Sequence, residues 1–101
     1  MPYEMLVGLH VTNDTIYQAY RAEMTPILIE CGGGFGYDLK IAEVLKSRTD
    51  NEINRVFTIY FPDREAMQQF FSAESYRAIK ARLFESSVAS TTIMAEYTRE
   101  G

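Results

Sequence analysis

The sequence predicts an α+β sandwich in which one four-stranded antiparallel sheet carries its helices on one side. The first observation is the order of the periodic segments: strand, helix, strand, strand, helix pair, strand. The second is the short connection between the two middle strands, which makes them antiparallel neighbours. Right-handed crossovers then place both helical segments on the same face of the sheet. With 101 residues, the chain is expected to form a single domain over residues 1–101.

The central stretch, residues 55–86, predicts a strand followed by two short helices. Every residue from Val56 to Phe61 is β-branched or aromatic, and Pro62 ends the strand. Asp63 is expected to cap the first helix and Ser72 the second. This gives a split second helix. Its apolar positions at helical spacing are Ala66, Met67, Phe70, Phe71, Tyr76, Ile79 and Leu83.

The first half of the chain predicts a strand and a helix. Residues 5–11 alternate in polarity with period 2, and Asn13 or Asp14 can cap the helix that follows. Pro26 lacks an amide proton, so we expect this helix to kink or break near Thr25. The glycines at 32–34 are expected to end it.

The remaining strands are expected at residues 35–42 and 88–97, with a polar connection at residues 47–54. A change of phase at residues 43–45 suggests a bulge or a bend there. Uninterrupted alternation assigns one set of residues to the helix-facing side. These are Met5, Val7, Leu9, Tyr37, Leu39, Phe57, Ile59, Phe61, Ile93 and Tyr97. The pattern is that of the ferredoxin-like sandwich, with topology βαββαβ.

The other face of the sheet is expected to be too apolar to stand in water. The residues assigned to it are Leu6, His10, Asp38, Lys40, Val56, Thr58, Tyr60, Met94 and Glu96. Sheet-on-sheet packing of two copies would cover this mixed surface, and two-fold pairing is the commonest closed symmetry. We therefore expect a homodimer through the sheet face, in the manner of a dimeric α/β barrel.

Composition narrows the range of partners and cofactors. The formal net charge is −4 and the ten basic residues are scattered, which argues against a nucleic-acid partner. No stretch approaches the roughly 20 apolar residues of a membrane span, and the N-terminus lacks the layout of a signal peptide, so a cytoplasmic location is expected. One histidine and one cysteine provide no metal-ligand cluster and no disulfide. We expect neither a metal nor a dissociable cofactor.

The glycine-rich segment at residues 32–36 does not match a nucleotide-binding motif. Its glycines follow a helix and precede a strand, whereas a phosphate-binding loop has the reverse order. Phe35 and Tyr37 are similar in spacing to an RNA-recognition strand, but Gly33 stands where a basic residue belongs. Neither phosphate nor RNA binding is expected.

Over nearly its full length, the chain resembles the family called domain of unknown function 1330, within the dimeric α/β-barrel superfamily. The resemblance lies in an ordered set of segments: MPYEMLVGLHVTN, then Tyr17, Tyr20 and Arg21, Pro26, GGGF, EVL, RVFTIYFPDREAMQQFF, SAESY and the closing strand. It implies a ferredoxin-like fold and a dimer but no established activity. Its superfamily includes small oxygenases, isomerases and haem-handling enzymes. This chain departs from the family pattern at the inserted Ser75 and at GYDLKIAE, where an arginine and glycines are usual.

The candidate site residues are Tyr17, Tyr20, Arg21 and His10. The tyrosines would shape a pocket between helix and sheet, where the resemblance implies small aromatic or carbonyl substrates, and Arg21 would orient an acid group of the ligand. His10 is the candidate catalytic residue, because an imidazole titrates near neutrality and can shuttle a proton. The alternatives are that the tyrosines are core residues and that His10 is satisfied across the dimer seam. Arg55 is expected to be a surface cation or a partner of Glu4 or Glu96.

Two functions follow from these expectations. The first is a homodimer that binds or transforms a small organic molecule in a pocket between helices and sheet, without metal. The alternative is a noncatalytic dimerisation or regulatory module, in which the same residues only fill the core. A deep, partly polar pocket would favour the first, and tightly packed tyrosines would favour the second.

Overall fold

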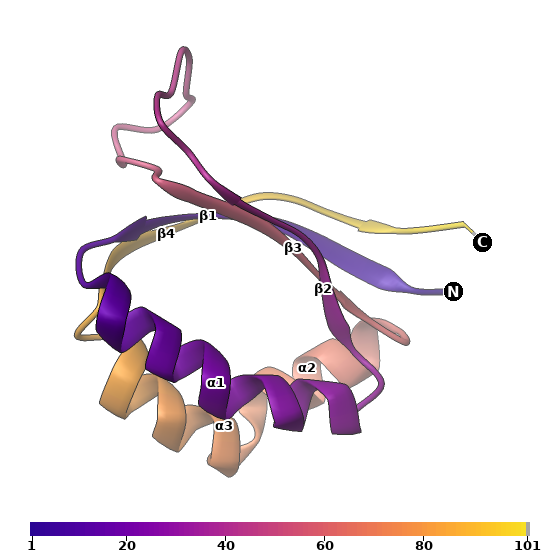
Figure 1. Cartoon of the computed structure of the whole chain (residues 1–101). Helices are drawn as coiled ribbons and strands as arrows, with labels where there is room; N and C mark the ends of the chain where they lie inside the picture. Colours follow the sequence, from indigo (N-terminus) through magenta and orange to yellow (C-terminus); the bar gives the residue numbers. More distant parts are fainter. Residues whose placement is uncertain (101) are drawn as a thin grey trace.

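The computed structural model describes residues 1–100 and confirms the expected order of elements. The elements are β1 (Tyr3–Val11), α1 (Asp14–Glu30), β2 (Gly34–Lys40), β3 (Arg55–Phe61), α2 (Arg64–Ser72), α3 (Glu74–Ile79), the π-helical turn η1 (Lys80–Phe84) and β4 (Val88–Thr98). The strands form one antiparallel sheet in the order β2-β3-β1-β4. All helices cover the same face of this sheet (Figure 1). The fold is the ferredoxin-like α+β sandwich.

Two of the expected helix caps are confirmed. The Asn13 side chain accepts a hydrogen bond of 3.1 Å from the Ile16 amide, and Asp63 accepts one of 2.8 Å from the Ala66 amide. The cap expected at Ser72 is wrong. Its hydroxyl donates back to the Gln68 carbonyl inside α2 instead, so α3 begins after a residue that has no capping side chain.

Of the kink or break expected near Thr25, the break is wrong, because α1 runs continuously from Asp14 to Glu30. Met24 and Leu28, on either side of the proline, are buried in the core. Their packing holds the helix together although Pro26 contributes no amide proton. As expected, the glycines end the helix: Gly32 has a φ of 84°, a conformation that glycine adopts without strain.

A bulge in β2 reverses the expected assignment of faces. Phe35 lies opposite Ile59 and Asp38 lies opposite Phe57, so Gly36 and Tyr37 together face a single residue of β3. Asp38 and Lys40 therefore lie on the helix-facing side, and Leu39 lies on the other side. The predicted burial of Tyr37 and Leu39 is wrong, since they are 70% and 49% exposed. Of the bulge or bend predicted at residues 43–45, the bulge is wrong, because β2 ends at Lys40, whereas a bend is present at Leu45.

The pairing of β4 with β1 contains two more register shifts, one between Leu6 and Val7 and one between His10 and Val11. Ala95 pairs with Leu6 and Ile93 pairs with Val7, which leaves Met94 as the extra residue. Beyond it, Glu96 lies on the helix-facing side and Tyr97 on the opposite side, the reverse of the prediction. Two hydrogen bonds follow from this arrangement. The Tyr3 hydroxyl donates to Glu96 at 2.9 Å, and the Tyr97 hydroxyl donates to Glu4.

The side of the sheet without helices is called the open face below. Its residues are Glu4, Leu6, His10, Leu39, Val56, Thr58, Tyr60, Met94 and Tyr97. The connection at residues 41–54 rises on this side, away from the helices (Figure 1). It is tied to the sheet by Asn51, whose amide donates to Thr92 at 3.1 Å, and by Ile53, which packs against Gly8.

Candidate functional site

A cavity of about 290 Å³ lies between the helices and the sheet. Its walls come from every strand and every helical segment. The lining residues are Met5, Val7, Leu9, Tyr17, Tyr20, Arg21, Met24, Phe35, Phe57, Ile59, Phe71, Tyr76, Lys80, Phe84, Thr91 and Ile93. Most of these side chains are apolar or aromatic, and the polar atoms are confined to a few groups. Such a lining is typical of small-molecule sites.

The mouth of the cavity lies between η1 and β4. Lys80, Thr91 and Ile93 are the exposed members of the lining. In η1 the Glu85 amide donates to the Lys80 carbonyl, five residues earlier, at 3.1 Å, which widens the helix locally. Lys80 and Phe84 both belong to this turn, and the Lys80 ammonium lies 5.8 Å from the Phe84 ring centroid. The π-helical turn therefore forms one lip of the opening.

Three buried tyrosines supply hydroxyl groups to the site. The hydroxyl oxygens of Tyr20 and Tyr76 are 2.7 Å apart, and the Arg21 Nε donates to the Tyr17 hydroxyl at 2.8 Å. Within the Tyr20–Tyr76 pair, only one of the two hydroxyl protons is shared. In the described chain, the other proton of the pair and the proton of Tyr17 have no protein acceptor. Two O–H donors therefore remain for a ligand.

Burial raises the pKa of all three tyrosines above the ordinary phenol value. For Tyr17, the positive charge of Arg21 and its hydrogen bond oppose this rise. For Tyr20, the neighbouring Tyr76 adds to it. The three phenols consequently keep their protons at neutral pH, and they act as hydrogen-bond donors and not as bases.

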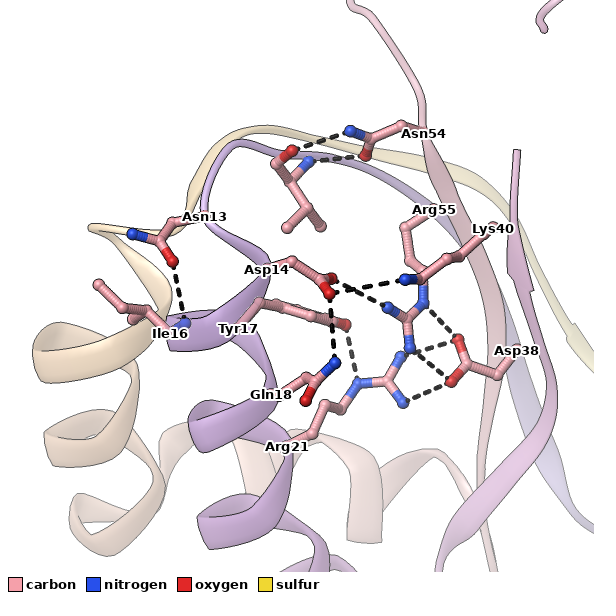
Figure 2. Close-up of polar contacts among 11 residues, drawn as sticks. Asn13, Asp14, Ile16, Tyr17, Gln18, Arg21, Asp38, Lys40, Asn54 and Arg55 are labelled. Carbon is pink, nitrogen blue, oxygen red and sulfur yellow. Dashed lines mark hydrogen bonds and ion pairs between the residues drawn. The ribbon is translucent and has the colours of Figure 1, made fainter. Parts of the chain in front are cut away.

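A polar cluster of six residues closes the cavity at the β2 side (Figure 2). Its members are Asp14, Tyr17, Arg21, Asp38, Lys40 and Arg55. Asp38 accepts two hydrogen bonds of 2.8 Å from Arg55 and two, of 3.2 and 3.3 Å, from Arg21. Asp14 lies 3.8 Å from Arg55 and 3.5 Å from Lys40. The cluster thus contains two carboxylates and three cations, so it carries one positive charge in excess.

The two arginines stabilise the ionised form of Asp38. The hydrogen bonds from Arg55 and the positive charge of Arg21 hold the pKa of Asp38 below its usual range, against the opposing effect of partial burial. Conversely, the bond to Asp38 raises the pKa of Arg55. The expectation that Arg55 pairs with Glu4 or Glu96 is therefore wrong. The bulge in β2 brings Asp38 to Arg55 instead.

Arg21 is held in the cavity wall by aromatic rings as well as by Asp38. Its guanidinium carbon lies 4.0 Å from the Phe35 ring centroid and 4.8 Å from that of Phe57. Only 14% of its side chain is exposed. Stacking on two rings and bonding to Tyr17 and Asp38 leave this side chain little freedom, so the Tyr17 hydroxyl has a fixed position.

The structure brings Tyr17, Tyr20 and Arg21 together in one cavity but leaves His10 apart from them. His10 lies on the open face, and its Nε2 is 3.0 Å from a carboxylate oxygen of Glu52. Three neighbours expected for it, Asp38, Lys40 and Glu96, lie on the other side of the sheet, so that part of the prediction is wrong. The catalytic role of His10 stays a prediction about the open face.

Sequence reasoning missed Tyr76, Asp38 and Lys80 as site residues. Tyr76 sits on an apolar helical stripe, where a tyrosine is usually a core residue. Asp38 was assigned to the wrong face, although Gly36 inside a strand is a known sign of a bulge. For Lys80 the sequence gives no signal, since the π-helical turn that places it is not visible in the pattern.

Residues 1–100 have neither a metal-ligand cluster nor a candidate membrane-spanning helix. These residues include no group of three or more histidine, cysteine, aspartate or glutamate side chains placed to hold a metal ion. Within the same range, none of the helices combines the length and the apolar character that a membrane crossing requires.

The fold and the site define a class of protein: a ferredoxin-like sandwich with an aromatic, hydroxyl-bearing cavity between its two layers. The chain belongs to the family described as "Domain of unknown function (DUF1330)", whose model matches residues 5–97. No curated protein matches the chain.

Several solved structures share the fold at low sequence identity. A protein of unknown function from Rhodopseudomonas palustris has a TM-score of 0.80 at 16% identity, over 99% of this chain and 83% of its own. A dimeric ferredoxin-like protein of unknown function from Jannaschia sp. has a TM-score of 0.66 at 11% identity, over 98% and 100%. A cofactor-independent oxygenase from Streptomyces nogalater, solved as a mutant, has a TM-score of 0.60 at 11% identity, over 99% and 92%.

Proposed function

We propose that this protein binds a small organic molecule in the cavity between its helices and its sheet. The observation that carries the proposal is the cavity itself, about 290 Å³ in volume and lined by aromatic and apolar side chains around a few hydroxyl groups. A module that served only for dimerisation would be expected to have a filled core here. Tyr17, Tyr20 and Arg21 form the ligand-binding wall, and Tyr76 joins them.

The size and lining of the cavity indicate the kind of ligand. An apolar cavity of about 150 Å³ is enough for benzene, so there is room for a compound of two fused rings. Its rings would contact Phe35, Phe57 and Phe84. The two free phenol protons would donate to an oxygen of the ligand.

The proposal is limited to binding because the cavity offers no free base. The carboxylate of Asp38 is engaged by two arginines, the phenols keep their protons, and His10 is on the other side of the sheet. The cofactor-independent oxygenase with a similar fold supports a search for catalysis without metal. Such a reaction would have to draw its base from the ligand or from solvent.

Binding can be tested with N-phenylnaphthylamine, an uncharged two-ring-system dye whose fluorescence increases in apolar surroundings. The purified protein should enhance its emission saturably. Ile93→Trp should block the mouth and abolish the enhancement, because Ile93 is 53% exposed and lines the opening. Ile29→Trp is the matched control, since Ile29 is 63% exposed and does not line the cavity. No enhancement by the wild type, or equal enhancement by both variants, would contradict the proposal.

We also propose that two copies pair through the open face. Leu39, Met94 and Tyr97 are exposed apolar or aromatic side chains on this face, and Val44 and Leu45 are exposed in the connection that rises above it. The structural neighbour from Jannaschia sp. is described as dimeric, which supports the pairing of two copies. A second copy would bury this surface at a two-fold axis.

A further inference from the structure

Asp38 occupies the position on Arg21 that an acidic ligand would need. Arg21 directs its two terminal nitrogens, Nη1 and Nη2, to the two oxygens of Asp38, and its Nε to the Tyr17 hydroxyl (Figure 2). This is the two-pronged geometry by which an arginine holds a carboxylate. The two terminal nitrogens of Arg21 are therefore occupied by the carboxylate of Asp38.

Arg55 keeps Asp38 in this position. Its Nε and Nη2 each donate to Asp38 at 2.8 Å, and the Arg55 side chain is only 13% exposed. The bulge at Gly36 and Tyr37 also contributes, because without it Asp38 would lie on the open face. Displacing Asp38 from Arg21 would thus require the loss of a strong pair and a local change in β2.

We propose that Asp38 is the specificity-determining residue of the cavity: it prevents an acidic ligand from binding the terminal nitrogens of Arg21, so the cavity favours uncharged ligands that carry a hydrogen-bond acceptor. This inference rests on the proposed binding function and refines it. Arg21 acts as a positioning residue, because it orients the Tyr17 hydroxyl and does not itself hold a charged group of the ligand. The ligand is a neutral, largely apolar molecule whose oxygen accepts from the phenols.

The charges of the cluster predict the effect of removing Asp38. With Asp38 neutralised, Arg21 has no carboxylate partner among residues 1–100, while Arg55 retains Asp14 at 3.8 Å. A ligand carboxylate could then displace the neutral side chain from the terminal nitrogens of Arg21, because a guanidinium binds a carboxylate more strongly than an amide oxygen. A hydrogen bond between charged groups at a half-buried site corresponds to a tenfold or greater change in affinity.

The experiment measures displacement of N-phenylnaphthylamine by three compounds with one ring system: tetralin, α-tetralone and tetralin-α-carboxylate. For the wild type we expect the ketone to displace the dye best and the carboxylate worst. Asp38→Asn should raise the affinity for the carboxylate about tenfold relative to the ketone. Asp14→Asn is the matched control, because Asp14 contacts Arg55 and Lys40 but not Arg21, and it should keep the wild-type order.

A second variant keeps the test valid if Asp38→Asn does not fold. In Arg21→Gln, the affinity for the carboxylate relative to the ketone should be no lower than in the wild type. The reason is that Asp38 already neutralises the charge of Arg21 in the wild type. Equal binding of ketone and carboxylate by the wild type, an unchanged ratio in Asp38→Asn, or a selective loss of carboxylate binding in Arg21→Gln would overturn the inference. In each of these cases the dye still binds, so the proposed function stands. If the dye does not bind at all, both fail.

Discussion

Asp38 and Arg55 form a two-pronged ion pair across β2 and β3, with Nε donating to Oδ1 and Nη2 to Oδ2 at 2.8 Å each. The pair joins the edge strand β2 to its neighbour β3 directly after the bulge in β2. Through Arg21 the same carboxylate also ties the sheet to α1. Asp38 therefore links three elements of the fold, so its protonation should affect stability.

Replacement of Asp38 by Asn should change how stability depends on pH. The folded-state pKa of Asp38 lies below the unfolded value of about 3.9, so its contribution is fully present above that pH. The contribution is lost as the pH falls from the unfolded-state pKa through the folded-state pKa, because in this window the unfolded chain binds more protons than the folded one. The difference in unfolding free energy between wild type and variant should be constant from pH 7 to about 5 and shrink below about 3.9.

Urea denaturation across this pH range measures the effect. Asp50→Asn is a suitable control, because Asp50 is exposed and makes no ion pair with the described residues. Its difference from the wild type should stay flat. A difference for Asp38→Asn that is equally flat down to pH 2 would show that the pair with Arg55 does not stabilise the ionised form.

The Tyr20–Tyr76 pair should show coupling between its two hydroxyls. Tyr20→Phe leaves the Tyr76 hydroxyl buried with no partner, and Tyr76→Phe does the same to Tyr20, so each change should cost about 1–3 kcal/mol. The double variant leaves no orphaned hydroxyl and should cost less than the sum. Denaturant titrations of the four proteins give the coupling energy. Tyr37→Phe, at a position 70% exposed, should be neutral within about 0.5 kcal/mol, and strict additivity of the pair would refute the coupling.

The order of the elements and the residues of the inner strands could be predicted from the sequence, whereas the faces of the edge strands could not. In β1 and β3 the alternation is unbroken, and Met5, Val7 and Phe57 are buried as predicted. In β2 one bulge adds a residue, in β4 two register shifts do so, and the side chains beyond each of them change face. Gly36 gave a weak sign of the first bulge. Met94 gave none of the second.

The candidate site was predictable only where its residues share one helix. Tyr17, Tyr20 and Arg21 lie three or four residues apart on α1, so helical geometry alone puts them on one face. Tyr76 is 56 residues from its partner Tyr20, and Asp38 is 17 residues from Arg21. Only the packing of the whole domain brings these pairs together. Arg21 was expected to orient an acid group of the ligand. Because Asp38 occupies its terminal nitrogens, we propose instead that Arg21 positions the Tyr17 hydroxyl.

Leu39→Glu and Met94→Glu should each separate the proposed dimer. These side chains are 49% and 41% exposed, and both lie on the open face, so the folded chain can accommodate a glutamate there in solvent. In a dimer that packs open face on open face, each substitution would bury two unpaired carboxylates, at a cost of several kcal/mol. Sedimentation equilibrium should give the mass of two chains for the wild type and of one chain for the variants.

Ile29→Glu tests whether the loss of pairing is specific to the open face. Ile29 is 63% exposed near the end of α1, on the helix-covered side, so this variant should remain a dimer. Circular dichroism of all three variants checks that the fold is kept. A wild type with the mass of one chain, or a dimer that survives both open-face substitutions, would rule out pairing through this surface. The binding cavity lies on the other side of the sheet, so its dye-binding test is independent of this result.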